Sequence, residues 1–264
     1  MSGDRAEARR GKNVGMRDPG LFESIAASYR AARPDYPSEL YDTLVQQGVI
    51  GPGRRVLEIG AGTGEATGEL VRRGGAVFAV EPGPELAARL RQACPEASVL
   101  VSQIEDVDLA AHRFDSVVAA TSMHWVDLPT VLPRLGQALE QGGLLAVWRT
   151  VFGDPRVQTP FRRAVDEIVA GRDETIPRTD PLEPRPTVAE LEAGSRFRLV
   201  RTWEWPWQTD LDATQIRALF ATFSDWQDQA ELDAVQAAAA AQPGPVTEHY
   251  VTILHLLRST TGET

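Results

Sequence analysis

Residues 56–70 read VLEIGAGTGEATGEL and connect a short apolar run to a helix-like segment through three glycines. The apolar run, 55–59, is bounded by glycine and is typical of a buried strand. Gly60, Gly62 and Gly64 permit the positive φ of a tight turn, and without a Cβ they leave the backbone open to a ligand. The stretch therefore predicts a strand, a ligand-binding turn and a helix.

Strand-like and helix-like segments alternate along most of the chain. Helical stretches between successive strands are typical of βαβ crossovers and of a parallel sheet covered on both faces. The expected strands are 55–59, 77–80, 98–101, 114–120, 144–148, 197–207 and 250–257, and the expected helices are 21–33, 38–48, 65–73, 84–93, 129–140, 159–170, 213–223 and 231–241. The sequence thus predicts a doubly wound α/β domain.

The predicted organisation is one domain behind a short arm. Residues 1–20 mix both signs of charge without an apolar run and predict a disordered basic arm. Residues 21–264 predict a single domain that comprises lid helices (21–53), a cofactor-binding core (54–150), and cap helices with the last two strands (151–264). Helices join those two strands to the parallel run, so we expect them to complete the same sheet.

Composition excludes several classes of function. Acidic residues outnumber basic ones by 37 to 27, and the net charge of −10 argues against a nucleic-acid partner. With one cysteine and four histidines, none at HExxH spacing, we expect no metal site. No apolar stretch approaches the ~20 residues of a membrane-spanning helix, and the N-terminus has no secretory signal. The sequence predicts a cytoplasmic protein without a membrane partner, and it carries no signal for an oligomeric state.

The glycine turn and a following acid indicate an adenosine-containing ligand. Glu81 ends the next expected strand, where a carboxylate can accept both ribose hydroxyls. The dinucleotide pattern GxGxxG needs a further glycine where this chain has Glu65, and a carboxylate at that helix N-terminus opposes a pyrophosphate. S-adenosylmethionine carries no phosphate, so we favour it over NAD.

On these residues the sequence resembles the class I S-adenosylmethionine-dependent methyltransferases, and within them the subgroup that includes trans-aconitate methyltransferases. The likeness extends to FESIAASYRAARPDYP (22–37), to SQIEDVDL (102–109) and to FDSVVAATSMHWVD (114–127), where the subgroup has an HW pair. The family implies a Rossmann-like fold, in which a mostly parallel, seven-stranded sheet ends in an antiparallel last strand and carries helical cap insertions.

The resemblance also implies a cofactor site. The three glycines would line the methionine and adenosine edge, Glu81 would bind the ribose, and Ile104 and Glu105 would flank the adenine. Arg33 would reach the methionine carboxylate, and many relatives have aspartate where this chain has Gln103. The full set of expected cofactor-binding residues is Tyr29, Arg33, Glu58, Gly60, Ala61, Gly62, Gly64, Glu81, Pro82, Gln103, Ile104, Glu105 and Thr121.

His124 is the candidate catalytic residue, since it follows the fourth strand, where ligands of open α/β sheets bind. Two interpretations stay open: a base or donor that acts on the acceptor, or a structural histidine beneath the site. The expected substrate-binding residues are Tyr29, His124 and Trp125.

Three tryptophans, Trp203, Trp205 and Trp207, alternate along an expected strand and therefore share one face. We expect them to pack the sheet against helices; the alternative is that one reaches an acceptor pocket, which would suit an apolar or aromatic substrate. Cys94 is expected to be a small buried hydrophobe, and His255 to be structural.

The predicted function is methyl transfer from S-adenosylmethionine to a small molecule by in-line displacement. Oxygen, as carboxylate or hydroxyl, is favoured over nitrogen or carbon. The Asn/Asp-Pro-Pro-aromatic motif of base-methylating enzymes is missing after the fourth strand, where the chain reads TSMHW. Two alternatives stay open, because a fold does not fix a function: an NAD(P)-dependent oxidoreductase, and a cofactor-retaining cyclase or binding protein that does not methylate.

Overall fold

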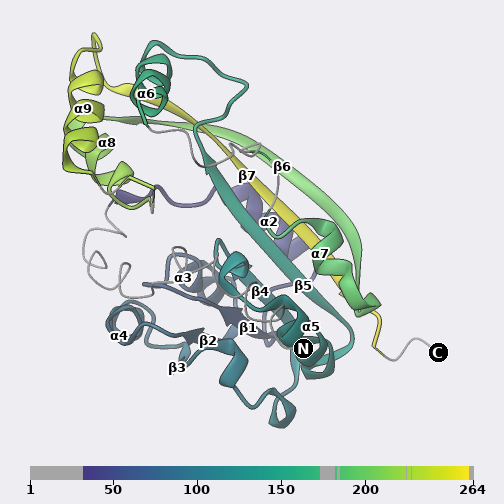
Figure 1. The fold of residues 1–264 in the computed structure, drawn as a ribbon. Coiled ribbons are helices and arrows are strands. Elements are labelled where there is room, and N and C mark those ends of the chain that lie inside the picture. The colour runs from purple at the N-terminus through teal and green to yellow at the C-terminus, as the bar shows by residue number, and fades with distance from the viewer. Residues whose placement is uncertain (1–31, 173–181, 183–184, 224, 227, 262–264) are drawn as a thin grey trace, which may run out of the picture.

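The computed structural model describes residues 32–172, 182, 185–223, 225–226 and 228–261. The predicted basic arm, nearly all of the first expected helix and Tyr29 lie outside these ranges. Figure 1 shows a sheet with helices around it, and a group of helices at the far end of its longest strands. No helix in the described ranges has the length and apolarity needed to cross a bilayer.

A seven-stranded sheet runs in the order β3-β2-β1-β4-β5-β7-β6. Strands β1 to β5 pair in parallel, and β7 is antiparallel to both of its neighbours, which confirms the predicted fold class. The chain moves outward from β1 to β3 and returns to β4, so the order reverses between β1 and β4, where open α/β sheets bind ligands. The strands are β1 (Arg55–Ile59), β2 (Ala76–Glu81), β3 (Ser98–Val101), β4 (Phe114–Ala120), β5 (Leu139–Phe152), β6 (Phe197–Leu211) and β7 (Val246–Ser259).

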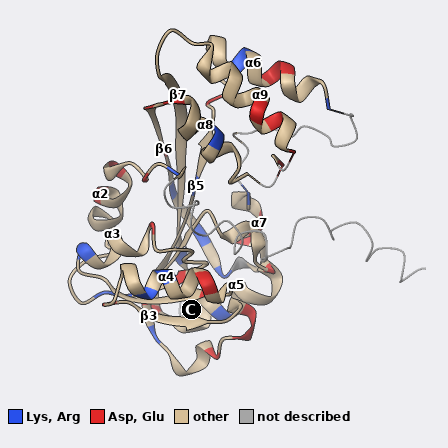
Figure 2. Cartoon of the chain, turned by 90° about the vertical axis from the view of Figure 1, so that its left-hand side faces the viewer, with Lys and Arg blue, Asp and Glu red and all other residues tan. Residues whose placement is uncertain are grey.

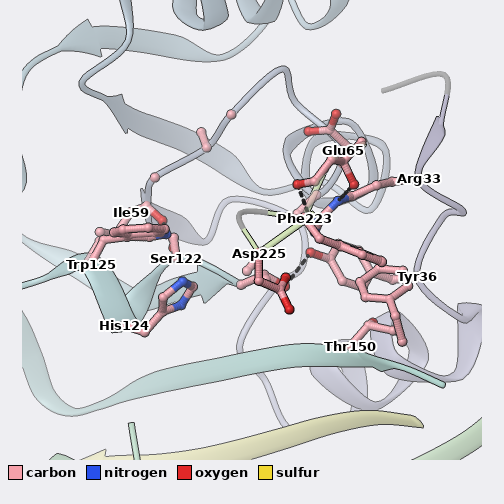
Figure 3. A pocket seen from close by; sticks show the side chains of 18 of the residues that line it. Arg33, Tyr36, Ile59, Glu65, Ser122, His124, Trp125, Thr150, Phe223 and Asp225 are labelled. Carbon is pink, nitrogen blue, oxygen red and sulfur yellow. Dashed lines mark hydrogen bonds between the residues drawn. The ribbon is translucent and has the colours of Figure 1, made fainter. Parts of the chain in front are cut away.

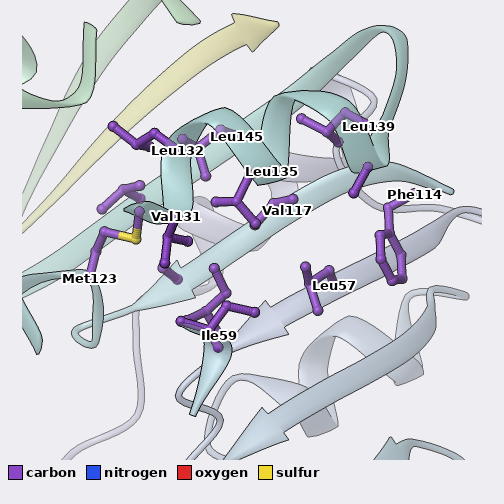
Figure 4. Packing of buried hydrophobic residues seen from close by; sticks show 14 of the residues in the cluster. Leu57, Ile59, Phe114, Val117, Met123, Val131, Leu132, Leu135, Leu139 and Leu145 are labelled. Carbon is purple, nitrogen blue, oxygen red and sulfur yellow. The ribbon is translucent and has the colours of Figure 1, made fainter. Parts of the chain in front are cut away.

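Helices cover both faces of the sheet. Successive residues of β1 point to opposite faces, so Val56 packs with α2, α3 and α4, whereas Leu57 packs on the face of α5 and α7. Figure 4 shows Leu135 of α5 close to Leu57 and Val117. These helices are α2 (Ser38–Gln46), α3 (Thr67–Arg72), α4 (Pro84–Ala93), α5 (Leu128–Ala138) and α7 (Val188–Glu192).

A cap of three helices stands on the extended ends of β5, β6 and β7 (Figure 1). It comprises α6 (Pro160–Ala170), α8 (Ala213–Phe220) and α9 (Gln229–Ala240). The cap has its own apolar cluster, in which Phe161 and Leu219 pack with Tyr250 of β7. The cap and the sheet therefore enclose space between them at the carboxyl ends of β1, β4 and β5.

The last three strands are longer than the sequence predicts. β5 extends four residues past 148, β6 continues to Leu211, and β7 begins at Val246. The added residues pair with a neighbouring strand: Thr150 of β5 pairs with Thr252 of β7, and Leu211 of β6 pairs with Val246 of β7. Partners across the sheet, rather than local hydropathy, decide these ends. The short helix α7 is absent from the prediction, although Thr187 and Glu190 form a capping box at its start.

Candidate functional site

A cavity of about 1010 Å³ lies where β1, β2, β4 and β5 end, beneath the cap (Figure 3). Pockets for one small ligand run from about 300 to 1,000 Å³, so this cavity has room for two small molecules. The predicted site residues that line it are Arg33, Glu58, Gly60, Ala61, Gly62, Glu81, Pro82, Gln103, Ile104, Glu105, Thr121, His124 and Trp125.

The glycine turn presents backbone to this cavity. Gly60 has φ +66°, and a Cβ built on it would lie 2.5 Å from the Cβ of Ser122. Gly62 has φ +60°, and the nearest atom to its Cβ position is a Glu65 oxygen at 3.4 Å. The family resemblance predicts Gly64 at the cofactor edge, but this glycine does not line the cavity. It packs against α4, where a Cβ built on it would lie 2.7 Å from the side chain of Leu90. Two of the three glycines therefore shape the ligand side of the turn.

Glu81 ties the end of β2 to this turn. Glu81 is 5% exposed, and its carboxylate accepts hydrogen bonds from the backbone N–H groups of Gly62 and Gly83, each at 2.8 Å. Each carboxylate oxygen can accept a second hydrogen bond. The side chain can therefore hold the turn and bind hydroxyl groups of a ligand at the same time.

Glu58 is a buried acid at the floor of the cavity. One of its oxygens accepts a hydrogen bond from the Thr67 hydroxyl at 2.7 Å, and the other has no hydrogen-bond partner among the described residues. Burial, with smaller contributions from Glu65 and Glu81, raises the pKa of Glu58 to about 8. The raised pKa favours the protonated, uncharged form of Glu58 near pH 7.

Hydrogen bonds hold the segment after β4 in place, although its backbone is strained at Thr121. Thr121 has φ +56°, uncommon for a non-glycine residue, and its N–H donates to the carbonyl of Trp148 at 2.7 Å. Its hydroxyl lies 3.0 Å from the Tyr36 hydroxyl. The Ser122 hydroxyl donates to the carbonyl of Ile59 in β1. These bonds hold β1, β4 and β5 together at the point where the next residues enter the cavity.

His124 extends from this segment into the cavity, with its ring 4.8 Å from that of Trp125 (Figure 3). The ring is open to the cavity, but the surrounding protein reduces its hydration. This loss of hydration, together with the positive charges of Arg149, Arg33 and Arg185, lowers the pKa of His124 to about 4. The imidazole is therefore neutral at pH 7 and keeps a lone pair that can accept a proton.

We expect the NMR titration midpoint of the His124 ring to lie below pH 5. Because the unfolded pKa is about 6.5, the unfolded chain takes up this proton first, so His124 lowers the stability of the fold as the pH falls from 6.5 towards 4. Proton–carbon spectra from pH 4 to 8 test this, with the signal assigned by its loss in His124→Asn. A midpoint near 6.5 contradicts the expected environment.

Arg33 joins the segment before α2 to the cap. Its guanidinium donates to the side chain and the carbonyl of Thr222, at 3.2 and 3.3 Å, and lies 5.1 Å from the ring centre of Phe152 and 5.5 Å from that of Phe223. Arg33 thus lines the cavity, with two of its donors turned towards the cap, and its contact with the methionine carboxylate stays a prediction.

Sequence reasoning missed several lining residues. Phe223 and Trp226 lie in loops and carry no motif, whereas Tyr36 lies in the stretch 22–37 that resembles the family, and this resemblance could have pointed to it. Phe152 is the last residue of β5, and because ligands bind at the carboxyl ends of strands it could have been identified had the end of β5 been predicted correctly.

The three tryptophans of β6 pack the sheet as predicted. Trp203 and Trp205 contact the cluster around α2 and α3, and the indole N–H of Trp207 donates to Thr252 at 2.9 Å; none of the three lines the cavity. Cys94 is buried beside Gly64, and His255 is buried with its Nδ1 2.8 Å from the Thr202 hydroxyl, so both fit the predicted structural roles.

Comparison with known proteins decides the class. Residues 57–147 match a family described as "Methyltransferase domain". An uncharacterized methyltransferase of Mycobacterium tuberculosis is 39% identical over 176 residues, which are 66% of this chain and 67% of that protein. The chain is a class I S-adenosylmethionine-dependent methyltransferase. This methyltransferase is also similar to an uncharacterized methyltransferase-like protein of Schizosaccharomyces pombe. The two are 27% identical over 209 residues, which are 78% of each chain.

Solved structures share the fold of the methyltransferase. A proposed type II methyltransferase from Anaeromyxobacter dehalogenans matches with a TM-score of 0.63 at 22% identity, over 86% of this chain and 97% of that one. The cavity of the methyltransferase suits S-adenosylmethionine on its own geometry. Gly62 brings the backbone to the cavity without a side chain, and the Glu81 carboxylate at the end of β2 lies beside it.

Proposed function

We propose that the methyltransferase methylates an oxygen atom of a small molecule held between the cofactor and the cap. S-adenosylmethionine supplies an electrophilic methyl group on a positively charged sulfur. The observation that carries the proposal is the single cavity that joins the glycine turn and Glu81 to His124 and the cap. A shared enclosed space brings two reactants together and excludes water, which supplies much of the rate of a displacement.

We assign the cofactor half of the cavity to residues at or just after the carboxyl ends of β2, β3 and β4, and to Arg33 before α2. Glu81 would bind the ribose hydroxyls, Ile104 and Glu105 would flank the adenine, and Thr121 and Arg33 would hold the methionine end. Each of these residues lines the cavity. Tyr29 lies outside the described residues, and its contact with the cofactor stays a prediction.

His124 would take the proton of an acceptor hydroxyl. Its neutral ring opens into the cavity, and general bases of this kind contribute about 10²–10⁴-fold in rate. A carboxylate acceptor has no proton to lose and needs no such base. The two acceptor types therefore differ in their dependence on His124.

We expect radiolabelled methyl to pass from S-adenosylmethionine to hydroxyl compounds in a panel of alcohols, phenols, carboxylates and amines. His124→Asn should lower kcat for a hydroxyl acceptor by about 100-fold with little change in KM, in keeping with the loss of a base. His249→Asn is the matched control, because His249 is half-buried on β7 and does not line the cavity.

Three results would contradict parts of this proposal. Label on amines alone rejects oxygen as the acceptor atom. An equal effect of the two histidine substitutions rejects His124 as the base. Cofactor binding without transfer to any compound favours a protein that retains the cofactor and does not methylate.

A further inference from the structure

The cap side of the cavity is an apolar chamber built largely from aromatic rings. Six residues form this cap chamber: Phe152, Val165, Val169, Phe220, Phe223 and Trp226. The rings pack tilted or edge to face. The ring centres of Phe152 and Phe223 are 5.2 Å apart at 48° between the ring planes, and those of Phe220 and Trp226 are 4.7 Å apart at 89°. Such a surface gains most from a ligand that buries apolar area against it.

Each ring of the cap chamber already has a guanidinium beside it. Arg33 lies over Phe152 and Phe223, Arg162 lies 5.8 Å from the centre of Phe220, and Arg172 lies 4.4 Å from that of Trp226. Aromatic faces attract cations, but these faces are supplied with cations by the protein itself. A positively charged acceptor would have to compete with these guanidinium groups for the ring faces.

Two of these arginines are in turn paired with acids. Arg162 makes two hydrogen bonds to the buried carboxylate of Glu248, and Arg172 makes two to Glu231, at 2.8 and 2.6 Å. Paired guanidinium groups offer little charge to a third partner. An anionic acceptor therefore finds no ready counter-ion at Arg162 or Arg172, and the third guanidinium, that of Arg33, is assigned above to the methionine end of the cofactor.

The cavity wall beside the cap chamber adds negative charge. Asp166 of α6 and Asp225 after α8 both line it, and Asp225 lies 3.9 Å from Arg172. Figure 2 shows acidic and basic positions side by side on α6. A carboxylate ligand would lose hydration on entry and would meet these two acids.

We infer that the cap chamber selects an uncharged, apolar ring compound as the methyl acceptor, and that it discriminates against carboxylates and ammonium compounds. The inference rests on the proposed function and narrows it: of the two oxygen acceptors considered, hydroxyl is retained. Selection by the chamber acts on binding and is independent of the proton transfer at His124.

Three probes of one shape test the selection: 2-naphthol, 2-naphthoate and 2-naphthylmethylammonium, each titrated calorimetrically at pH 7.5 with saturating S-adenosylhomocysteine. We expect 2-naphthol to bind at least tenfold more tightly than either charged probe. Equal or tighter binding of a charged probe overturns the inference, and so does the failure of all three to bind. The prior titration with S-adenosylhomocysteine alone separates the cases, because its failure removes the proposed function instead.

Variants assign the selectivity to the chamber. Val169→Asp places a carboxylate in the apolar wall of the chamber and should weaken the binding of 2-naphthol at least tenfold. Val200→Asp makes the same change at an exposed position of β6 and should leave the affinity for 2-naphthol unchanged. The double variant Asp166→Asn, Asp225→Asn should bind 2-naphthoate several-fold more tightly than the unmodified protein does. Its affinity for 2-naphthol should stay within twofold of the unmodified value. Thermal midpoints verify that each variant is folded. Equal effects of the two valine substitutions, or no gain for 2-naphthoate, overturn the inference.

Discussion

Replacement of Glu81 by glutamine is expected to raise the Kd of S-adenosylhomocysteine at least tenfold. The carboxylate of Glu81 accepts two backbone N–H groups and has further acceptor capacity for the ribose. Glutamine keeps the shape but replaces one acceptor oxygen with a donor, which then faces another N–H group. Loss of a charge-assisted hydrogen bond costs about 1.4 kcal/mol or more, a factor of ten in affinity. Isothermal titration at pH 7.5 measures the change.

Two controls separate direct contact from a disturbed turn. Glu85→Gln makes the same chemical change at an exposed position four residues further on, and its Kd should match that of the unmodified protein. An S-adenosylhomocysteine analogue without ribose hydroxyls should bind the unmodified protein more weakly than S-adenosylhomocysteine does. The Glu81→Gln variant should bind this analogue with nearly the same affinity as the unmodified protein. If the unmodified protein binds both ligands equally, the ribose contact does not exist.

Gly60→Ala is expected to destabilise the fold and to weaken S-adenosylhomocysteine binding by about 100-fold or more. The new Cβ would sit at a φ of +66°, a conformation that costs an L-residue about 1–2 kcal/mol. It would also lie 2.5 Å from the Cβ of Ser122, and such overpacking costs a further 1–3 kcal/mol, roughly. Ser122 must shift, and with it the segment that carries His124. Thermal denaturation and calorimetric titration measure the two effects.

Gly53→Ala is the matched control for backbone strain. Gly53 has φ +75°, but its Cβ position has no atom within 4 Å, so this variant should show only the conformational cost and retain ligand binding. In Gly60→Ala, a second change of Ser122→Gly removes the opposing Cβ and should restore part of the affinity. Similar losses of stability and binding in Gly53→Ala and Gly60→Ala would show that the contact with Ser122 is unimportant.

The parts of the fold with local signals could be predicted from the sequence. Pro84 begins α4, and Gly60 to Gly64 mark the turn after β1, so the prediction places these elements within a residue or two. The periodicity of Phe114–Ala120 likewise identifies β4 with its observed bounds. In each case a few neighbouring residues restrict the backbone enough to fix the element.

The acceptor side could not be predicted in this way, because it depends on contacts between distant residues. Arg33 and Thr222 are 189 residues apart and meet only after the sheet has placed the cap. Phe223 and Trp226 carry no motif, and the extended ends of β5, β6 and β7 depend on pairing with the neighbouring strand. The raised pKa of Glu58 arises from its burial in the folded chain, which the spacing of Glu58 and the three glycines in the sequence does not predict.

A crystal structure of the complex with S-adenosylhomocysteine tests most directly whether the cavity beneath the cap is the methyl-transfer site. We expect the nucleoside to lie along the glycine turn, with its ribose hydroxyls about 2.6–3.2 Å from the Glu81 carboxylate. The sulfur atom should face His124 and the cap chamber. A nucleoside bound elsewhere, or one in this cavity with its ribose away from Glu81, would contradict the assignment.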